Sequence, residues 1–117
     1  MQRDIDLIKE ILIQIENSDK VKGWINIQIP EYSDKEIYYH IKLLHEAGLI
    51  EAVNQTTKSG FQWAAKSLTW HGHEFLDAAR NDTVWKKLKD KLKEQGGNIP
   101  FHVIKEMAVQ YSKDLFL

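Results

Sequence analysis

One stretch, residues 33–50, constrains the fold of this chain most, because it reads as a complete helix followed at once by a strand. Ser33 and Glu36 have the S-x-x-E spacing of a capping box, in which each side chain accepts a hydrogen bond from the backbone N–H of the other residue. Gly48 stands where helices commonly end in a left-handed residue. The sequence therefore predicts a helix over 33–47. Its apolar face recurs at i, i+4 and i+7 and consists of Ile37, Ile41 and Leu44.

The segments around this helix predict an α+β fold. Residues 4–17 show the helical spacing of isoleucine and leucine, and residues 24–29, WINIQI, alternate with the period of a half-buried strand. Residues 49–53 and 61–69 predict a hairpin around the polar tip NQTTKSG, whose Gly60 can take positive φ. Further helices are expected at 70–80, at 83–95 and beyond Pro100.

A helix that ends in E-A-G-L-I and feeds a hairpin resembles the recognition helix of a winged helix-turn-helix domain, with the hairpin as its wing. Thr69 is expected to cap the next helix, and Gly72 in its first turn allows the strand end and the helix start to pack closely. The sequence departs from the standard motif in one respect. Between Gly23 and Ser33 there is no room for the helix that normally precedes a recognition helix and crosses the phosphate backbone. That helix is missing, or reduced to a single turn near Pro30.

The composition narrows the function classes. A chain of 117 residues predicts one domain, with a winged-helix core at 1–69 and a helical extension at 70–117. Sixteen basic and seventeen acidic residues give a net charge of −1, which argues against binding nucleic acid or membranes by overall charge but leaves room for a local basic patch. The absence of cysteine excludes disulfides and thiolate metal sites and fits a reducing cytoplasm. The start MQRDIDLIKE is not a signal peptide, and no apolar run approaches the ~18 residues of a membrane span, so we expect a cytoplasmic protein without membrane contact.

The predicted DNA-binding residues lie on the outer face and flank of the helix at 33–47 and at the wing tip. Lysines there could bind phosphates, and tyrosines could donate to a phosphate or contact a thymine methyl. Against this, the helix carries two lysines and three acids, a sum of −1, which favours the alternative that its outer face is only solvated. The candidate residues are Lys35, Tyr38, Tyr39, Lys42 and Lys58.

Other candidate chemistry is weaker. The five lysines at 86–93 could touch phosphates, but a charge run on an amphipathic helix is usually a solvated face. His71 and His73 point apart on a helix and cannot share a zinc ion as an i, i+4 pair can. His40 lies near the inner face and is expected to be a satisfied core or boundary histidine. Without a cysteine nucleophile, a G-x-S-x-G elbow, a phosphate-cradling glycine loop or an acid pair, we expect no enzyme, no metal site and no cofactor.

Four tryptophans are many for this length, and they are expected to fill the core: Trp24, Trp63, Trp70 and Trp85. In the alternative, Trp63 or Trp85 is exposed and anchors a protein partner, because tryptophan favours interface hot spots. The apolar tail at 115–117 either packs back on its own domain or docks into a second copy, which would give a weak homodimer through the C-terminal helices.

Several stretches together resemble one bacterial and phage family, domain of unknown function 2513. They are MQRDIDLIKEILIQIE, YSDKEIYYHIKLLHEAGLIEA, LTWHGHEFLDAARNDTVWKKLK and GGNIPFHVIKEMA. The resemblance implies a small, single-domain, winged-helix-like protein of a kind often found in prophages, and it brings no catalytic residue, cofactor or partner. We expect a non-enzymatic protein that binds double-stranded DNA or has a regulatory role. The alternative is a protein-interaction module, with a phage or host protein as partner, that retains the fold without binding DNA.

Overall fold

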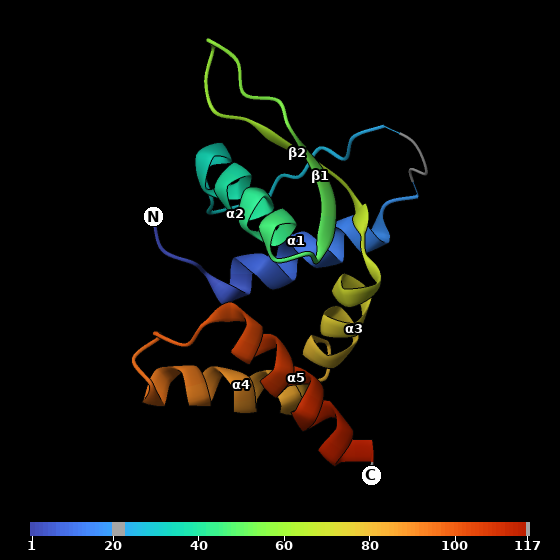
Figure 1. The fold of residues 1–117 in the computed structure, drawn as a ribbon, viewed down its shortest axis with the longest axis vertical. Helices are drawn as coiled ribbons and strands as arrows, with labels where there is room; N and C mark the ends of the chain where they lie inside the picture. Colours follow the sequence, from blue (N-terminus) through green and yellow to red (C-terminus); the bar gives the residue numbers. More distant parts are fainter. Residues whose placement is uncertain (20–22, 117) are drawn as a thin grey trace. The chain divides into compact units, whose positions relative to one another are not determined.

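The computed structural model describes residues 1–19 and 23–116, which form five helices and one two-stranded sheet (Figure 1). The predicted α+β fold class is confirmed. The chain divides into two compact units, Met1–Gly72 and His73–Leu117. The single domain expected over 1–117 stays a prediction. In chain order the elements are α1 (Ile5–Asn17), α2 (Asp34–Glu46), β1 (Ile50–Asn54), β2 (Trp63–Leu68), α3 (Trp70–Ala79), α4 (Asp82–Glu94) and α5 (Phe101–Phe116).

The first helix begins where the sequence supplies a cap. Asp4 is the N-cap of α1, and its Oδ1 accepts hydrogen bonds from the backbone N–H groups of Asp6 at 3.0 Å and Leu7 at 3.1 Å. The cap satisfies two of the donors that a helix start leaves open. The apolar face of α1 is buried in the first unit and consists of Leu7, Ile8, Ile11, Leu12 and Ile15.

The helix predicted at 33–47 is confirmed as α2. The Oγ of Ser33 accepts a hydrogen bond from the N–H of Glu36, and Glu36 Oε1 accepts one from the N–H of Ser33, both at 3.1 Å, so the capping box is present. Gly48 follows the helix with φ +77°, the left-handed conformation expected of it. The inner face of α2 consists of Ile37, Ile41 and Leu44 and is buried. The helix packs against α1.

The predicted hairpin is confirmed, with slightly different strand ends. β1 and β2 pair antiparallel, from Ile50 opposite Leu68 to Asn54 opposite Trp63, with a bulge-like register shift after Glu51. In Figure 1 the hairpin extends away from α1 as a long two-stranded arm.

The hairpin tip is closed by its own hydrogen bonds. Thr57 and Gly60 exchange two backbone bonds of 3.1 and 3.0 Å, and Gly60 has φ +143°, the positive value expected of it. Below the tip, the N–H of Gln55 donates to the carbonyl of Gln62 at 2.8 Å and so continues the ladder past the strand ends. The tip is therefore an ordered extension of the sheet.

The strand predicted at 24–29 is wrong. Of this segment only Ile25 pairs with the sheet, through an isolated bridge in which its N–H donates to the carbonyl of Ala65 at 2.9 Å. The alternation nevertheless sets burial, because Ile27 and Ile29 are buried whereas Asn26 and Gln28 are exposed. Alternation reports which side chains face the core, whereas a strand also needs a partner backbone running alongside it.

No helix lies between residues 23 and 33, as the sequence predicted. The chain makes a single turn there, in which the N–H of Tyr32 donates to the carbonyl of Ile29 at 3.3 Å. Glu31 in this turn has φ +76°, which is uncommon for a residue other than glycine.

The junction between β2 and α3 is a close backbone contact. The Oγ1 of Thr69 donates to the carbonyl of Gly48 at 2.6 Å and accepts from the N–H of Gly72 at 3.1 Å, which confirms Thr69 as a cap for α3. The N–H of Thr69 also donates to the carbonyl of Leu49 at 3.0 Å. A Cβ at Gly72 would overlap the carbonyl oxygen of Leu49, so only glycine fits there. The close packing predicted from the sequence is confirmed.

The second unit has its own apolar interior, built from the rest of α3, α4 and α5. Asn81 caps α4, with its Oδ1 accepting from the N–H groups of Thr83 and Val84. The rings of Phe75 and Phe101 meet with centroids 5.6 Å apart. The buried side chains of this unit include Phe75, Leu76, Val84, Leu88, Ile104 and Ala108.

The apolar face of α5 is buried only along the first part of the helix. Ile104 and Ala108 are buried, and Met107 and Tyr111 are half-buried. Leu115 is 43% exposed and Phe116 is 78% exposed, so the buried face ends before the end of α5. The last residue of the tail, Leu117, lies outside the described residues.

The tryptophans do not fill the core, and that prediction is wrong. Trp70 is 77% exposed and Trp24 45% exposed, while Trp63 and Trp85 are half-buried. The buried side chains are mainly branched aliphatic residues of the helices, and Phe75 is the single aromatic among the buried apolar residues that the structure describes. In that same part of the chain, each helix is too short or too polar to cross a membrane.

Candidate nucleic-acid interface and adjoining pocket

A hydrogen-bond network holds α2 against the start of α1. The backbone N–H of Asp4 donates to Nε2 of His40 at 2.9 Å, and Nδ1 of His40 lies 2.8 Å from the carbonyl of Glu36. Since Nε2 is the acceptor, Nδ1 carries the proton and donates it to the backbone carbonyl of Glu36. His40 is 1% exposed, so the expected satisfied core histidine is confirmed.

Tyr32 joins the same network from the turn before α2. Its hydroxyl donates to Oδ2 of Asp4 at 2.9 Å. This hydrogen bond, with lesser contributions from burial and from the negative charges of Asp4, Asp6 and Glu36, raises the pKa of Tyr32 to about 12. Asp4 therefore caps α1, accepts from Tyr32 and donates to His40, so one residue links the start of α1 to the turn before α2 and to α2 itself.

The outer face of α2 carries three of the five candidate residues. Lys35 is exposed in the first turn, and Tyr39 and Lys42 are half-buried further along. The structure brings Tyr39 and Lys42 together, with Nζ of Lys42 6.0 Å from the centre of the tyrosine ring. Nζ of Lys42 also lies 3.4 Å from Oε2 of Glu46, so its charge is partly neutralised within the helix.

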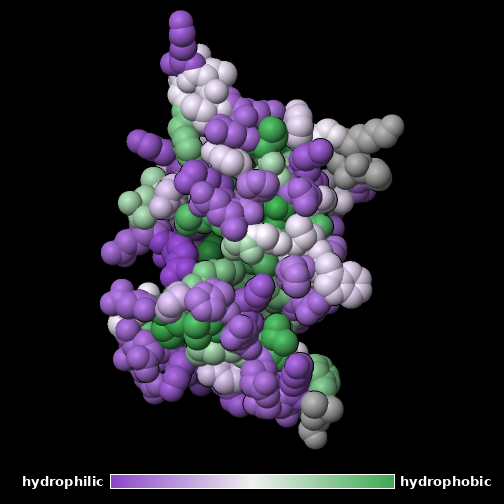
Figure 2. All heavy atoms as spheres, in the orientation of Figure 1, coloured by the Kyte–Doolittle hydropathy of each residue, from purple (hydrophilic) through white to green (hydrophobic). Residues whose placement is uncertain are grey.

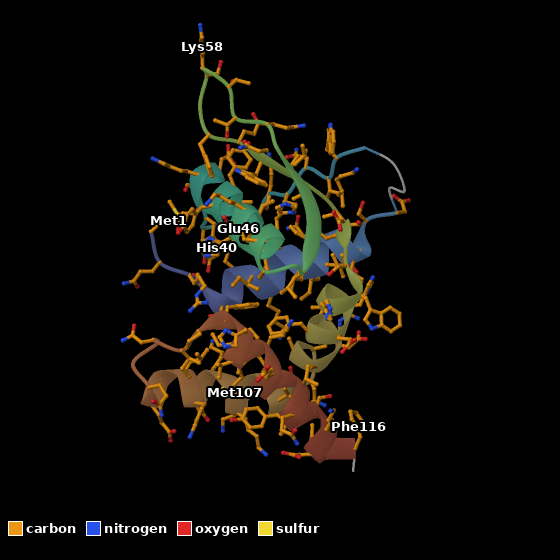
Figure 3. The ribbon with its side chains drawn as sticks, viewed as in Figure 1. Met1, His40, Glu46, Lys58, Met107 and Phe116 are labelled. Atoms are coloured by element: carbon orange, nitrogen blue, oxygen red, sulfur yellow. The ribbon has the colours of Figure 1, made fainter. Side chains whose placement is uncertain are left out.

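Lys58 occupies the far end of the hairpin. It is exposed at the tip, where Figure 3 shows it pointing outward, and Figure 2 shows hydrophilic atoms at the very end of the arm above paler ones. The N–H of Ser59 donates to Oγ1 of Thr57 at 3.1 Å, which fixes the tip next to it. Lys58 therefore presents a positive charge on an ordered hairpin tip, and this tip is separate from the lysines of α2.

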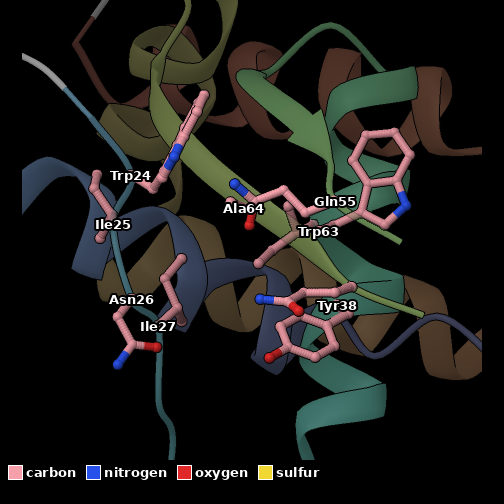
Figure 4. A pocket seen from close by; sticks show the side chains of 10 residues that line it. Trp24, Ile25, Asn26, Ile27, Tyr38, Gln55, Trp63 and Ala64 are labelled. Atoms are coloured by element: carbon pink, nitrogen blue, oxygen red, sulfur yellow. The ribbon is translucent and has the colours of Figure 1, made fainter. Parts of the chain in front are cut away.

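The remaining candidate, Tyr38, lies at a pocket that the sequence did not predict. The pocket has a volume of about 210 Å³ and opens between α2, β2 and the segment before α2. Figure 4 shows Tyr38 at one side and Asn26 and Ile27 at the other, with Trp63 and Ala64 on β2. None of the lining residues is charged: Trp24, Ile25, Asn26, Ile27, Tyr38, Ile41, Gln55, Gln62, Trp63 and Ala64.

Four polar side chains at the pocket form no hydrogen bond within the described part of the chain. Asn26, Gln55 and Gln62 form no side-chain hydrogen bond to another described residue, and neither does the hydroxyl of Tyr38. One sequence signal could have indicated the site. Gln55 and Gln62 stand symmetrically about the hairpin tip, so the ladder has to place them opposite each other.

Behind the pocket, Trp63 packs on α2. Its ring lies 5.6 Å from that of His45, at 44° between the ring planes. Trp63 Nε1 and His45 Nδ1 are buried and make no hydrogen bond within the described chain. This ring pair ties β2 to the last turn of α2.

The histidines and the lysine helix were the other candidates in the sequence. No group of three or more His, Asp or Glu side chains among them could hold a metal ion. The lysines at 86–93 are exposed on α4 in the second unit, where Lys91 lies 3.5 Å from Glu94 and Lys87 lies 5.9 Å from the ring of Tyr111.

Comparison with known proteins supplies the family. The profile described as hypothetical protein (DUF2513) matches residues 2–98. The chain belongs to this family. It is 38% identical over 112 residues to a protein of Haemophilus influenzae described as uncharacterized, and the match covers 92% of each chain. No solved structure matches the chain. The match runs from residue 2 to just beyond α4, and so contains all five candidate residues.

Proposed function

We propose that this protein is a non-enzymatic binding protein without a cofactor, whose first unit is winged-helix-like and contacts double-stranded DNA through α2 and the hairpin. The observation that supports this most is the direct connection between the two. The N–H of Leu49 donates to the carbonyl of Leu44 at 3.0 Å, so the chain leaves α2 and enters β1 within one turn. In this arrangement α2 is the recognition-like helix and the hairpin is the wing.

The charges predict how such a contact behaves. α2 carries Asp34, Glu36 and Glu46 against two lysines, and the usual preceding helix is replaced by a single turn. Phosphate contacts then come mainly from Lys35, Lys42 and Lys58. Each neutralised phosphate contributes about −0.9 to the slope of log affinity against log salt, so three contacts give a slope of about −3. The proposed affinity for DNA is therefore low at physiological salt and rises as the salt concentration falls.

An NMR titration of the isotope-labelled chain with a mixed-sequence duplex at low salt tests the proposal. Amide signals of α2 and the hairpin tip should shift, and the shifts should fade as salt rises. Lys58→Gln should lower the salt slope by about 1, whereas Lys89→Gln on α4 serves as the matched control and should leave it unchanged. Shifts confined to 86–93, or none with duplex in excess, would contradict the proposal.

A second candidate function, docking of a protein partner on the first unit, is favoured by its exposed indoles. Trp70 is 77% exposed at the start of α3, and Trp24 is 45% exposed with Nζ of Lys66 5.4 Å from its ring. Exposed tryptophan is a common interface anchor. If the duplex produces no shifts, capture experiments with wild type and Trp70→Ala are the next comparison, and loss of a captured protein in the variant would support this function.

A further inference from the structure

The pocket marks the place where an expected strand leaves the sheet. Ile25 is bridged to Ala65. In an antiparallel ladder the residue two positions after Ile25 lies opposite the residue two positions before Ala65, so a continued ladder would set Ile27 opposite Trp63. No such pair forms, and both residues line the pocket instead. The ring of Tyr38 from α2 occupies the side of this opening (Figure 4).

The lining selects one chemical class of ligand. With no charged side chain, the pocket offers no partner for a phosphate, a carboxylate or a metal ion. It offers instead three amides, each with donors and an acceptor, and a phenol. These groups are held beside the aromatic rings of Trp24, Tyr38 and Trp63. A neutral planar ring with hydrogen-bonding edges matches both features.

We propose that this pocket binds a single unstacked nucleobase, with adenine the best match. Asn and Gln side chains pair with the adjacent donor and acceptor of adenine, and unstacked bases pack on aromatic rings. The volume of about 210 Å³ equals about seven waters at roughly 30 Å³ each, room for one purine ring but not for a base pair.

Tyr38 connects this pocket to the proposed interface, because it belongs to α2 and lines the pocket. The source of the base, a nucleic acid, rests on the proposed function. The ability of the pocket to accept a nucleobase rests only on its lining residues. The two statements can therefore fail separately.

The test titrates adenosine, which carries no phosphate, into the isotope-labelled full chain, with thymidine as the comparison probe. Adenosine should give saturable shifts at the amides of Asn26, Tyr38 and Gln62, with an affinity at least about fivefold higher than that of thymidine. No saturable shift, or equal affinity for both nucleosides, would overturn the inference. Equal binding of an uncharged acetylated peptide amide would also overturn it, since the pocket would then accept any amide.

Three variants locate the site. Tyr38→Ala and Gln62→Leu should each weaken adenosine binding about tenfold or more. The control is Gln110→Leu, at an exposed position of α5 outside the pocket, which should leave adenosine binding unchanged. Gln62 is exposed on the hairpin, so its variant tests the site even if Tyr38→Ala fails to fold. Adenosine binding without duplex binding would refute the proposed function alone, and duplex binding without adenosine binding would refute this inference alone.

Discussion

The backbone N–H of Asp4 donates a hydrogen bond to Nε2 of His40 across 36 residues of sequence. This hydrogen bond fixes the N-cap of α1 to the middle of α2. Because the same Asp4 side chain caps α1 and accepts from Tyr32, three parts of the first unit depend on one residue.

Replacing His40 by leucine should destabilise the first unit strongly. The leucine fills a similar space but leaves the part-buried N–H of Asp4 without its acceptor, and a buried donor without a partner costs up to about 1–3 kcal/mol. Chemical denaturation of the full chain would measure the loss in the free energy of unfolding. The control is His71→Leu, at an exposed position on α3, which should change stability by less than about 0.5 kcal/mol. Equal losses in the free energy of unfolding would mean that the hydrogen bond does not stabilise the chain.

The ionisation of Tyr32 should make stability fall at high pH. Its pKa is raised from the ordinary 10.0 to about 12 by the hydrogen bond to Asp4, so the folded chain favours the neutral phenol. The contribution to stability is full below pH 10 and is lost as the pH rises through 12. Denaturation at a series of pH values should show this extra loss in wild type and not in Tyr32→Phe. In ultraviolet titrations the last tyrosine to ionise should disappear in that variant.

Gly72→Ala should cost about 3 kcal/mol or more, the upper end of what overpacking costs, because the new methyl group meets the backbone carbonyl of Leu49 and neither can move aside. Gly48→Asn is the informative comparison. Gly48 has φ +77° and open space around it, and asparagine tolerates that conformation, so its cost should stay small. If Gly72→Ala is as mild as Gly48→Asn, the close contact between the Leu49 carbonyl and α3 is wrong.

Glu46→Gln should strengthen duplex binding. The change frees Lys42 from a partner 3.4 Å away and moves the net charge of α2 from −1 to 0. Affinity at low salt should rise severalfold and the salt slope should steepen. Glu94→Gln, which frees Lys91 on α4 in the same way, is the matched control and should have no comparable effect. A gain from Glu94→Gln alone would place the contact on the lysine helix.

Local signals made part of this structure predictable. The capping box of Ser33 and Glu36, the period of the buried isoleucines and the left-handed Gly48 each act within a few residues, and all three are present. The failed strand at 24–29 and the exposed Trp70 depend on which distant backbone or surface lies alongside, which no short pattern records. The pocket is non-local for the same reason, since its residues come from three separate segments.

The single bridge at Ile25 has a consequence for how the sheet meets other molecules. A two-stranded sheet has two open edges, and a row of unpaired backbone groups on either can recruit a strand from another chain. Here Ile25 is bridged to Ala65 of β2 and interrupts that edge, and the register shift after Glu51 breaks the regular spacing on β1. The arm can therefore extend into solvent without offering a continuous template for aggregation.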